Sequence, residues 1–367
     1  MIYFDSAASY PILDETRSVL IDSFRTLYGN SSSIHALGQK ESEHIEDARR
    51  YLSELIDAYP SEIVFTSSAT ESNNLALKSI IPNPKKHIIT AQSEHKCILS
   101  ITQYLAKLGF DVTYVKPNFD GIITADVIKS EIRKDTALIS IMHVNNELGT
   151  INDIKGIGQL CLDNQILFHC DAAQSLCKVT IDVDELNVDM MSFSAHKIGG
   201  PKGIGALYIR DCRTKNIEPV IHGAGQEQGI RGGTVATPLI SGFLASLKNF
   251  PNYYEKVQLE NIKNQLVSRL IEEKVPYQIN GCNTVNHIIS LTLMNTNIET
   301  LIQENEQLFC LAQGSACSSK EIEPSHVLMA LGLTTELAHK TLRISFHHQI
   351  TQNDVNILIN AIKIHTS

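Results

Sequence analysis

In the stretch from Met190 to Gly205, Lys197 follows a largely apolar run and a histidine, and stands just before a glycine-rich turn. A lysine held in this way can be partly desolvated, which lowers the pKa of its amine and frees it to form a Schiff base with a carbonyl cofactor. Most lysines instead lie in solvent. Taken alone, Lys197 fits either description.

A second segment supplies the acid that pyridoxal phosphate chemistry needs beside a lysine, to hold the pyridinium nitrogen. Residues 166–170 form a short apolar run that predicts a buried strand, and the run ends at Asp171. Ligand chemistry in α/β proteins normally occurs at such strand ends. Asp171 therefore fits the pyridinium partner, and Gln174, three residues on, could reach the ring hydroxyl.

A third segment fits a phosphate site. Residues 62–65 read as a strand, and Ser68 and Glu71 then have the spacing of a capping box before a helical run. Free N–H groups and the dipole at a helix N-terminus hold anions. Most capping boxes bind nothing, but in register with Asp171 and Lys197 this one predicts a phosphate cup.

Cysteine usage indicates a chain kept reduced. The 367 residues include eight cysteines, with no C-x-x-C pair and no zinc-ligand spacing, so we expect neither a disulfide framework nor a metal site. Seven of the cysteines have no special context, and we expect most of these seven to be small core residues. They are Cys97, Cys161, Cys170, Cys177, Cys212, Cys282 and Cys310. Cys317 differs, because it stands in a small, polar run typical of a functional loop. A thiol there would be accessible and partly ionised near neutral pH.

Charge and hydropathy limit the partners. The formal charge of −9, from 31 basic and 40 acidic side chains, disfavours extensive direct contact with nucleic acid. We find neither a basic, apolar leader nor a run near the roughly 20 residues of a membrane helix. We therefore expect a cytoplasmic protein without membrane contact.

The order of apolar runs predicts an α/β fold with a mostly parallel, helix-covered sheet. The strand-like runs are 62–66, 87–91, 111–115, 137–144, 165–170, 189–194 and 204–209. They lie in a predicted large domain, 15–245. The sequence Phe250-Pro251-Asn252 interrupts the pattern, and a helix is expected over 254–273. Strands at 286–293 and a last helix at 352–364 predict a smaller α+β domain made of 250–367 and 1–14.

These motifs together resemble one family, the cysteine desulfurases of the bacterial iron–sulfur and nitrogenase-maturation type, within class V of the fold-type I pyridoxal phosphate enzymes. The resemblance runs from Tyr3 to about Ser345. The ordered set of segments that carries it is 69–74, 94–96, 142–149, 171–175, 192–197, 231–234, 314–319 and 343–345.

The resemblance implies roles for individual residues. His95 would stack on the pyridine ring and relay protons, and Cys317 would be the sulfur-accepting nucleophile. Asn146 and Arg343 would bind the substrate carboxylate, which suits a planar guanidinium. The phosphate would be held by Ala69, Thr70, Ser194 and His196, with Thr234 reaching over from the second subunit of a homodimer.

The implied activity is conversion of L-cysteine to L-alanine, with the sulfur passed as a persulfide on Cys317 to an acceptor protein. The acceptor stays open among iron–sulfur cluster, tRNA thiolation and DNA phosphorothioation pathways, since housekeeping members carry a tail beyond the position of Ser367. One alternative is a selenocysteine lyase or another class V enzyme such as an aminotransferase. A further alternative is a sulfur-relay or docking subunit.

Overall fold

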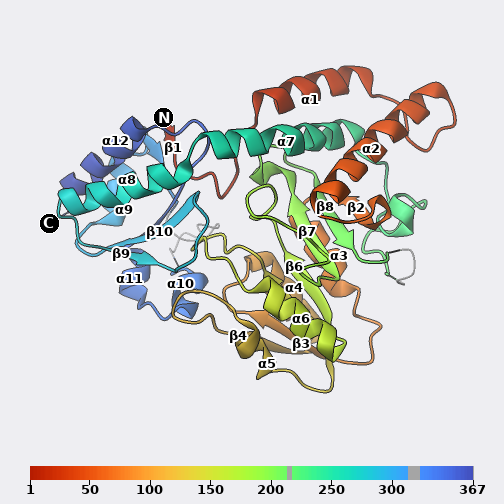
Figure 1. Ribbon diagram of the computed structural model, residues 1–367, viewed down its shortest axis with the longest axis horizontal. Helices are drawn as coiled ribbons and strands as arrows, with labels where there is room; N and C mark the ends of the chain where they lie inside the picture. The colour runs from red at the N-terminus through yellow and green to blue at the C-terminus, as the bar shows by residue number, and fades with distance from the viewer. Residues whose placement is uncertain (213–216, 313–322, 367) are drawn as a thin grey trace.

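The computed structural model describes residues 1–212, 217–312 and 323–366 and is built around a seven-stranded sheet of order β2-β8-β7-β6-β5-β3-β4 (Figure 1). The strands are β2 (Ile63–Thr66), β3 (His87–Ala91), β4 (Asp111–Val115), β5 (Thr136–Met142), β6 (Leu167–Asp171), β7 (Met190–Ser194) and β8 (Gly205–Ile209). Only β8 runs antiparallel to its neighbours. All seven predicted strands are confirmed, with ends that differ by at most two residues.

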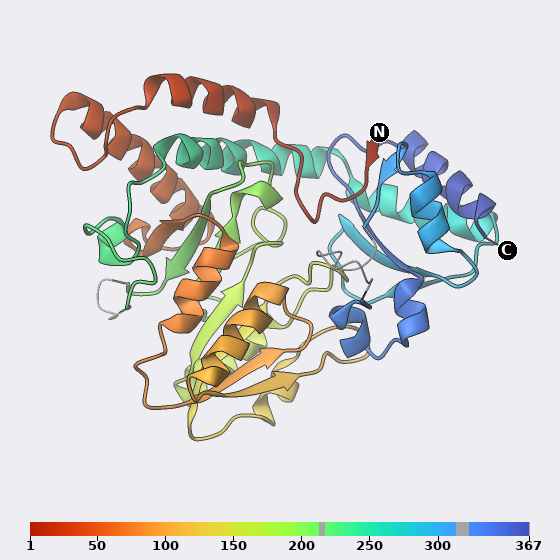
Figure 2. The same ribbon diagram turned by 180° about the vertical axis from the view of Figure 1, so that it is seen from behind.

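Outside the edge strand β4, nearly all side chains of this sheet are buried on both faces, because they alternate between two cores. In β2, Ile63 and Phe65 enter one core, and Val64 enters the other. The first core is covered by α2 (Ala36–Leu55), α6 (Ile154–Asn164) and α7 (Thr237–Lys256). The second is covered by α3 (Ala69–Lys78) and α4 (Lys96–Lys107), which lie in front of the sheet in Figure 2. Burial on both faces is why these strands read as continuous apolar runs.

A second, smaller sheet has its own core. Its strands β9 (Tyr277–Asn280), β10 (Ile288–Leu293) and β12 (Thr341–Ser345) are antiparallel, with β10 in the middle. Two helices, α8 (Leu259–Glu272) and α12 (Gln352–Ile364), contact each other and pack on this sheet. The other elements are β1 (Ile2–Tyr3), α1 (Asp14–Thr26), η1 (Pro60–Glu62), α5 (Ala125–Lys129), η2 (Ala195–Lys197), η3 (Glu227–Gly229), α9 (Ile298–Glu304), β11 (Phe309–Cys310), α10 (His326–Ala330) and α11 (Thr335–His339).

The predicted break at Phe250-Pro251-Asn252 is wrong, because α7 continues through Pro251 to Lys256. A proline inside a helix costs about 3 kcal/mol. Packing offsets this cost: Phe250 is fully buried and its ring contacts those of Tyr10 and Tyr254. The expected helix over 254–273 is therefore the end of α7 followed by α8.

We infer two domains from the two cores, with α7 running from the large sheet towards the smaller one (Figure 1). The proposed division at 15–245 and 250–367 then falls within α7. The first residues bridge both parts, since Phe4 joins the small core and Tyr10 and Leu13 join the large one. β1 also pairs with β11 of the small domain.

Candidate active site

A cavity of about 400 Å³ lies where the strands β6 and β7 end, and most of the predicted site residues line it. The structure brings together Ala69, Thr70, His95, Asn146, Asp171, Gln174, Ser194, His196, Lys197 and Arg343. Thr234 does not line the cavity and is exposed. Cys317 lies outside the described residues. The parallel strands explain the gathering, since their carboxyl ends meet at one edge of the sheet.

Lys197 ends the short helix η2, which directly follows β7. Its Nζ donates to the backbone oxygens of Ala7, at 2.6 Å, and Ala8, at 2.9 Å. Burial lowers the pKa of Lys197 to about 8, and the positive charge of Arg343 acts in the same direction. The carboxylates of Asp171 and Asp5 oppose the shift but do not cancel it. The predicted desolvation of Lys197 is thus present in the structure.

Asp171 is the last residue of β6, and its carboxylate is buried and held on both oxygens. Oδ2 accepts from Asn73 Nδ2 at 2.7 Å, and Oδ1 accepts from the backbone N–H of Ala173 at 3.0 Å. Gln174 is also buried, and its Nε2 donates to the backbone oxygen of Ala7. An acid oriented this firmly suits a partner for a protonated ring nitrogen.

The predicted helix N-terminus at Ser68 is present, but the capping box is only half formed. Ser68 Oγ accepts from the backbone N–H of Glu71, whereas the Glu71 carboxylate accepts from Ser67 instead of Ser68. Burial acts to raise the pKa of Glu71, but hydrogen bonds from Arg231 and Ser67 outweigh it and hold the pKa below its usual value. Gly205 allows the start of β8 to lie against the backbone of Ser68. A side chain at this position would clash, because its Cβ would lie 2.8 Å from the carbonyl carbon of Ser68.

Arg343 reaches the cavity from β12, in the small domain. Its Nη2 donates to Asp5 Oδ1 at 2.6 Å, and its Nη1 donates to the backbone oxygen of Asn146 at 3.1 Å. The Nε of Arg343 has no partner among the described residues, although it is buried. A ligand carboxylate could accept from this free donor.

The cavity fits a phosphorylated pyridine aldehyde. Besides Arg343 Nε, the buried oxygens of Asn146 and Gln174 lack partners among the described residues, and each such atom costs about 1–3 kcal/mol when unpaired. All three residues line the cavity, together with the amine, the acid and the helix N-terminus. Within the described ranges no group of three or more potential metal ligands occurs.

Several cavity residues were not predicted. The cavity is also lined by Asp5, Cys97, Glu147 and His326. Asn73 donates a hydrogen bond to the carboxylate of Asp171. Cys97 was expected among the core cysteines, yet it is only half-buried, as are Cys177 and Cys310, and Cys282 is exposed. Asn73 and Glu147 lie inside two of the motifs and Cys97 directly follows a third, so their positions could have signalled them.

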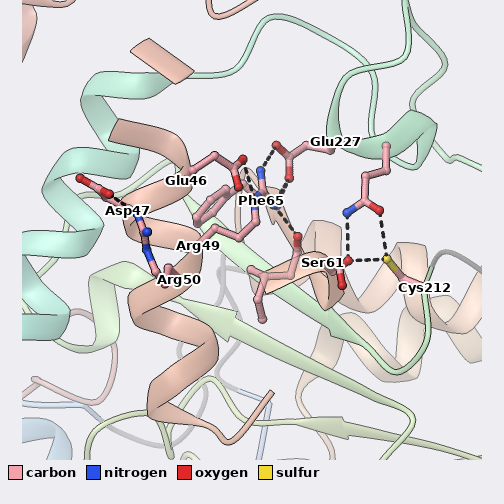
Figure 3. A network of polar contacts seen from close by, with 10 residues as sticks. Glu46, Asp47, Arg49, Arg50, Ser61, Phe65, Cys212 and Glu227 are labelled. Carbon is pink, nitrogen blue, oxygen red and sulfur yellow. Dashed lines mark hydrogen bonds and ion pairs between the residues drawn. The ribbon is translucent and has the colours of Figure 1, made fainter. Parts of the chain in front are cut away.

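The segment that carries Arg231 and Thr234 is tied to α2 by a buried ion pair (Figure 3). Arg49 on α2 donates through both terminal nitrogens to Glu227, at 2.8 and 2.9 Å. Glu227 also accepts from the backbone N–H of Phe65. Further along, Arg231 pairs with Glu71 in the first turn of α3. The segment is therefore fastened both to α2 and to the predicted phosphate cup.

We expect Glu227→Gln to lower the free energy of unfolding by about 3–5 kcal/mol, because it leaves the buried Arg49 charge with only the exposed carboxylate of Glu46 as a counter-charge. Glu46→Gln is the matched control. Glu46 pairs with the same Arg49, but its side chain is 55% exposed against 4% for Glu227, so its loss should cost at most about 1 kcal/mol. Urea denaturation measures the free energy of unfolding of both variants. Equal losses in the two variants would contradict a dominant role for the buried Arg49–Glu227 pair.

No helix in the described part of the chain is long and apolar enough to cross a membrane.

Comparison with known proteins agrees with this geometry. The aminotransferase class-V family matches residues 2–358. The chain is 42% identical to the mitochondrial cysteine desulfurase of Candida maltosa, over 98% of this chain and 76% of that protein. It is 43% identical to the cysteine desulfurase IscS of Pseudomonas savastanoi, over 97% and 90%. A solved structure described as SspA in complex with cysteine matches with a TM-score of 0.86 at 40% identity, over 96% of this chain and all of that one. The chain therefore belongs to the class-V aminotransferase family and, within it, to the cysteine desulfurases.

Proposed function

We propose that this chain uses pyridoxal phosphate to convert L-cysteine to L-alanine and passes the sulfur, as a persulfide on Cys317, to an acceptor protein. One observation carries the proposal: the desolvated amine of Lys197, the buried carboxylate of Asp171 and the guanidinium of Arg343 line a single cavity. These are an amine for a carbonyl cofactor, an acid for its ring nitrogen and a cation for a substrate carboxylate.

The chemistry of each cavity residue indicates which part of the cofactor it would contact. Asp171 would hold the ring nitrogen, His95 would lie against the ring, and Gln174 would meet the ring hydroxyl. The phosphate would be held by Ala69, Thr70, Ser194 and His196. When bound, the cofactor would supply the electron sink that acidifies the α-proton of an amino acid.

Lys197 is well suited to accept that proton. With a pKa of about 8, roughly one Lys197 in ten is neutral at pH 7, against about one in 2,500 for an unperturbed lysine. Only the neutral amine can take a proton or attack a carbonyl carbon. Arg343 would orient the substrate through its free Nε and through its contact with the Asn146 backbone.

The chain on both sides of Cys317 is attached to the cavity, which supports a role for this thiol. Ala312 lines the cavity, and its backbone oxygen accepts from the Arg343 N–H at 3.0 Å. On the other side, Ser325 donates to the Glu147 carboxylate, and His326 Nε2 lies 2.8 Å from the backbone oxygen of Glu94.

We also propose a homodimer. Thr234 is exposed and lies away from the cavity of its own subunit, as expected of a residue that completes the phosphate site of a partner. Large apolar side chains of α1 and the segment after it, Ile21, Phe24, Tyr28 and Ile34, are also exposed. A closed two-fold pair is the commonest way to cover such surfaces.

We also propose that the protein is cytoplasmic and that its sulfur acceptor belongs to one of the three pathways named above. The cysteines of the described residues are free thiols, which suits a reducing compartment.

The proposal is tested by incubating the purified protein with L-cysteine and a thiol reductant and quantifying both products. We expect alanine and sulfide in equal amounts. Release of alanine from L-selenocysteine alone would favour the selenocysteine lyase. Formation of a persulfide from another sulfur donor, without any alanine, would favour a relay subunit.

A further inference from the structure

Cys97 places a thiol beside the proposed cofactor site. It lines the cavity in the first turn of α4, directly after the motif Glu94-His95-Lys96. Its Sγ lies 3.0 Å from His95 Nδ1 and 3.2 Å from Asn73 Nδ2. The same Asn73 nitrogen lies 2.7 Å from Asp171 Oδ2. The four side chains thus form an unbroken chain of polar contacts.

The direction of each hydrogen bond in this chain can be worked out. The backbone N–H of Cys97 donates to His95 Nδ1 at 3.2 Å, and a backbone N–H can only donate. Nδ1 therefore carries a lone pair and no proton. The neighbouring Sγ can approach this lone pair only as an S–H donor.

Asn73 sets the other end of the chain. An ionised carboxylate only accepts, so the Asn73 atom beside Asp171 must be the amide nitrogen. Its two protons then go to Asp171 Oδ2 and to Cys97 Sγ. Between Asn73 and His95, Sγ accepts one hydrogen bond and donates the other, which gives the sequence Asp171, Asn73, Cys97, His95. The side chain of Thr70 also hydrogen-bonds to Cys97 and lies outside this sequence.

The surrounding charges support this arrangement. Burial raises the pKa of the Cys97 thiol to about 12, with Asp171 acting in the same direction, so the S–H proton is retained. Desolvation by the surrounding protein also lowers the pKa of His95, which favours the neutral ring. Four charged or titratable groups face His95: Asp171 and Glu147 oppose this shift, and Lys197 and His326 favour it.

We infer that Cys97 and Asn73 are positioning residues. They keep the single ring proton of neutral His95 on Nε2 and couple the orientation of the His95 ring to Asp171. The inference rests on the proposed function only in that His95 must meet the cofactor and substrate there. A ring in this form donates a hydrogen bond from Nε2 and cannot accept a proton at that atom. The α-proton then goes to Lys197, and His95 serves as a donor. Cys97, held as a thiol, does not compete with Cys317 for sulfur.

The first test reads the ring directly, without turnover. In the purified protein labelled with ¹³C,¹⁵N-histidine, His95 is assigned by the signal that disappears in His95→Gln. We expect NMR shifts of the neutral form with the proton on Nε2. A proton on Nδ1 overturns the inference, whether or not the protein holds a cofactor, so this result is separable from a failure of the proposed function.

The second test compares Cys97→Ala with Cys97→Ser. Alanine removes the S–H donor to Nδ1 and leaves only the backbone N–H of residue 97 there, which raises the pKa of His95 and should move the acid limb of the pH profile of kcat/KM to higher pH. It should also lower kcat/KM at neutral pH roughly three- to tenfold, the worth of one neutral hydrogen bond. Serine keeps a donor and should restore both values and the NMR signature.

Cys161→Ala is the control, because it removes a buried thiol of α6 that does not line the cavity. It should leave the pH profile and the His95 signal unchanged. Identical behaviour of Cys97→Ala and wild type would overturn the role of Cys97. Equal loss in Cys97→Ala and Cys97→Ser would show that packing, not hydrogen bonding, is what the thiol provides.

Discussion

Replacing Lys197 with alanine is expected to lower kcat for alanine formation from L-cysteine by at least about three powers of ten. Among the described residues, Lys197 is the only lysine that lines the cavity with a pKa brought down to about 8, and the substitution removes its amine. Lys197→Arg should be nearly as inactive, because arginine keeps the charge but has no amine that loses its proton near neutral pH.

Lys202→Ala is the matched control, since Lys202 is exposed and lies only five residues further along the chain. It should retain near-normal activity. Borohydride treatment of the wild type should fix the cofactor to the peptide that contains Lys197, as read by mass spectrometry. An adduct on Lys202 or on any other lysine would contradict the assignment of Lys197.

Cys317→Ser is expected to separate cofactor binding from sulfur transfer. Serine is close in size to cysteine, but its hydroxyl is a far weaker nucleophile without an activating base. The variant should therefore bind pyridoxal phosphate and change its absorption spectrum with L-cysteine. It should release alanine at least about a thousandfold more slowly and carry no persulfide.

The control for this variant is Cys282→Ser, which changes an exposed thiol and should leave alanine release intact. Near-normal turnover by Cys317→Ser, with the persulfide on another cysteine, would overturn the role of Cys317. Loss of cofactor binding would instead indicate that Cys317 has a structural role.

The amino-acid sequence was sufficient for the large sheet because its signals are local. Apolar runs of strand length, separated by helical periods, predict the seven strands to within one or two residues. The same runs end at Asp171 and Ser194, so the cavity at the edge of the sheet also follows from local patterns. The amphipathic pattern over 352–364 likewise coincides with α12.

The helix through Pro251 could not be predicted in this way. Local preference favours a break at proline, and the packing of Phe250 against Tyr10, 240 residues earlier in the chain, outweighs it. Such a contact has no signature within the segment itself.

By itself the sequence determined which residues could do chemistry: a lysine before a glycine-rich turn, an acid at a strand end and a capped helix start. Only the tertiary structure decided how strongly these residues are desolvated and which hydrogen-bond partners they have. Lys197 is desolvated and donates to Ala7 and Ala8, and Arg343 meets Asp5, each across more than 180 residues. Hydrogen bonds and desolvation depend on distances of a few ångströms, which the sequence order does not contain.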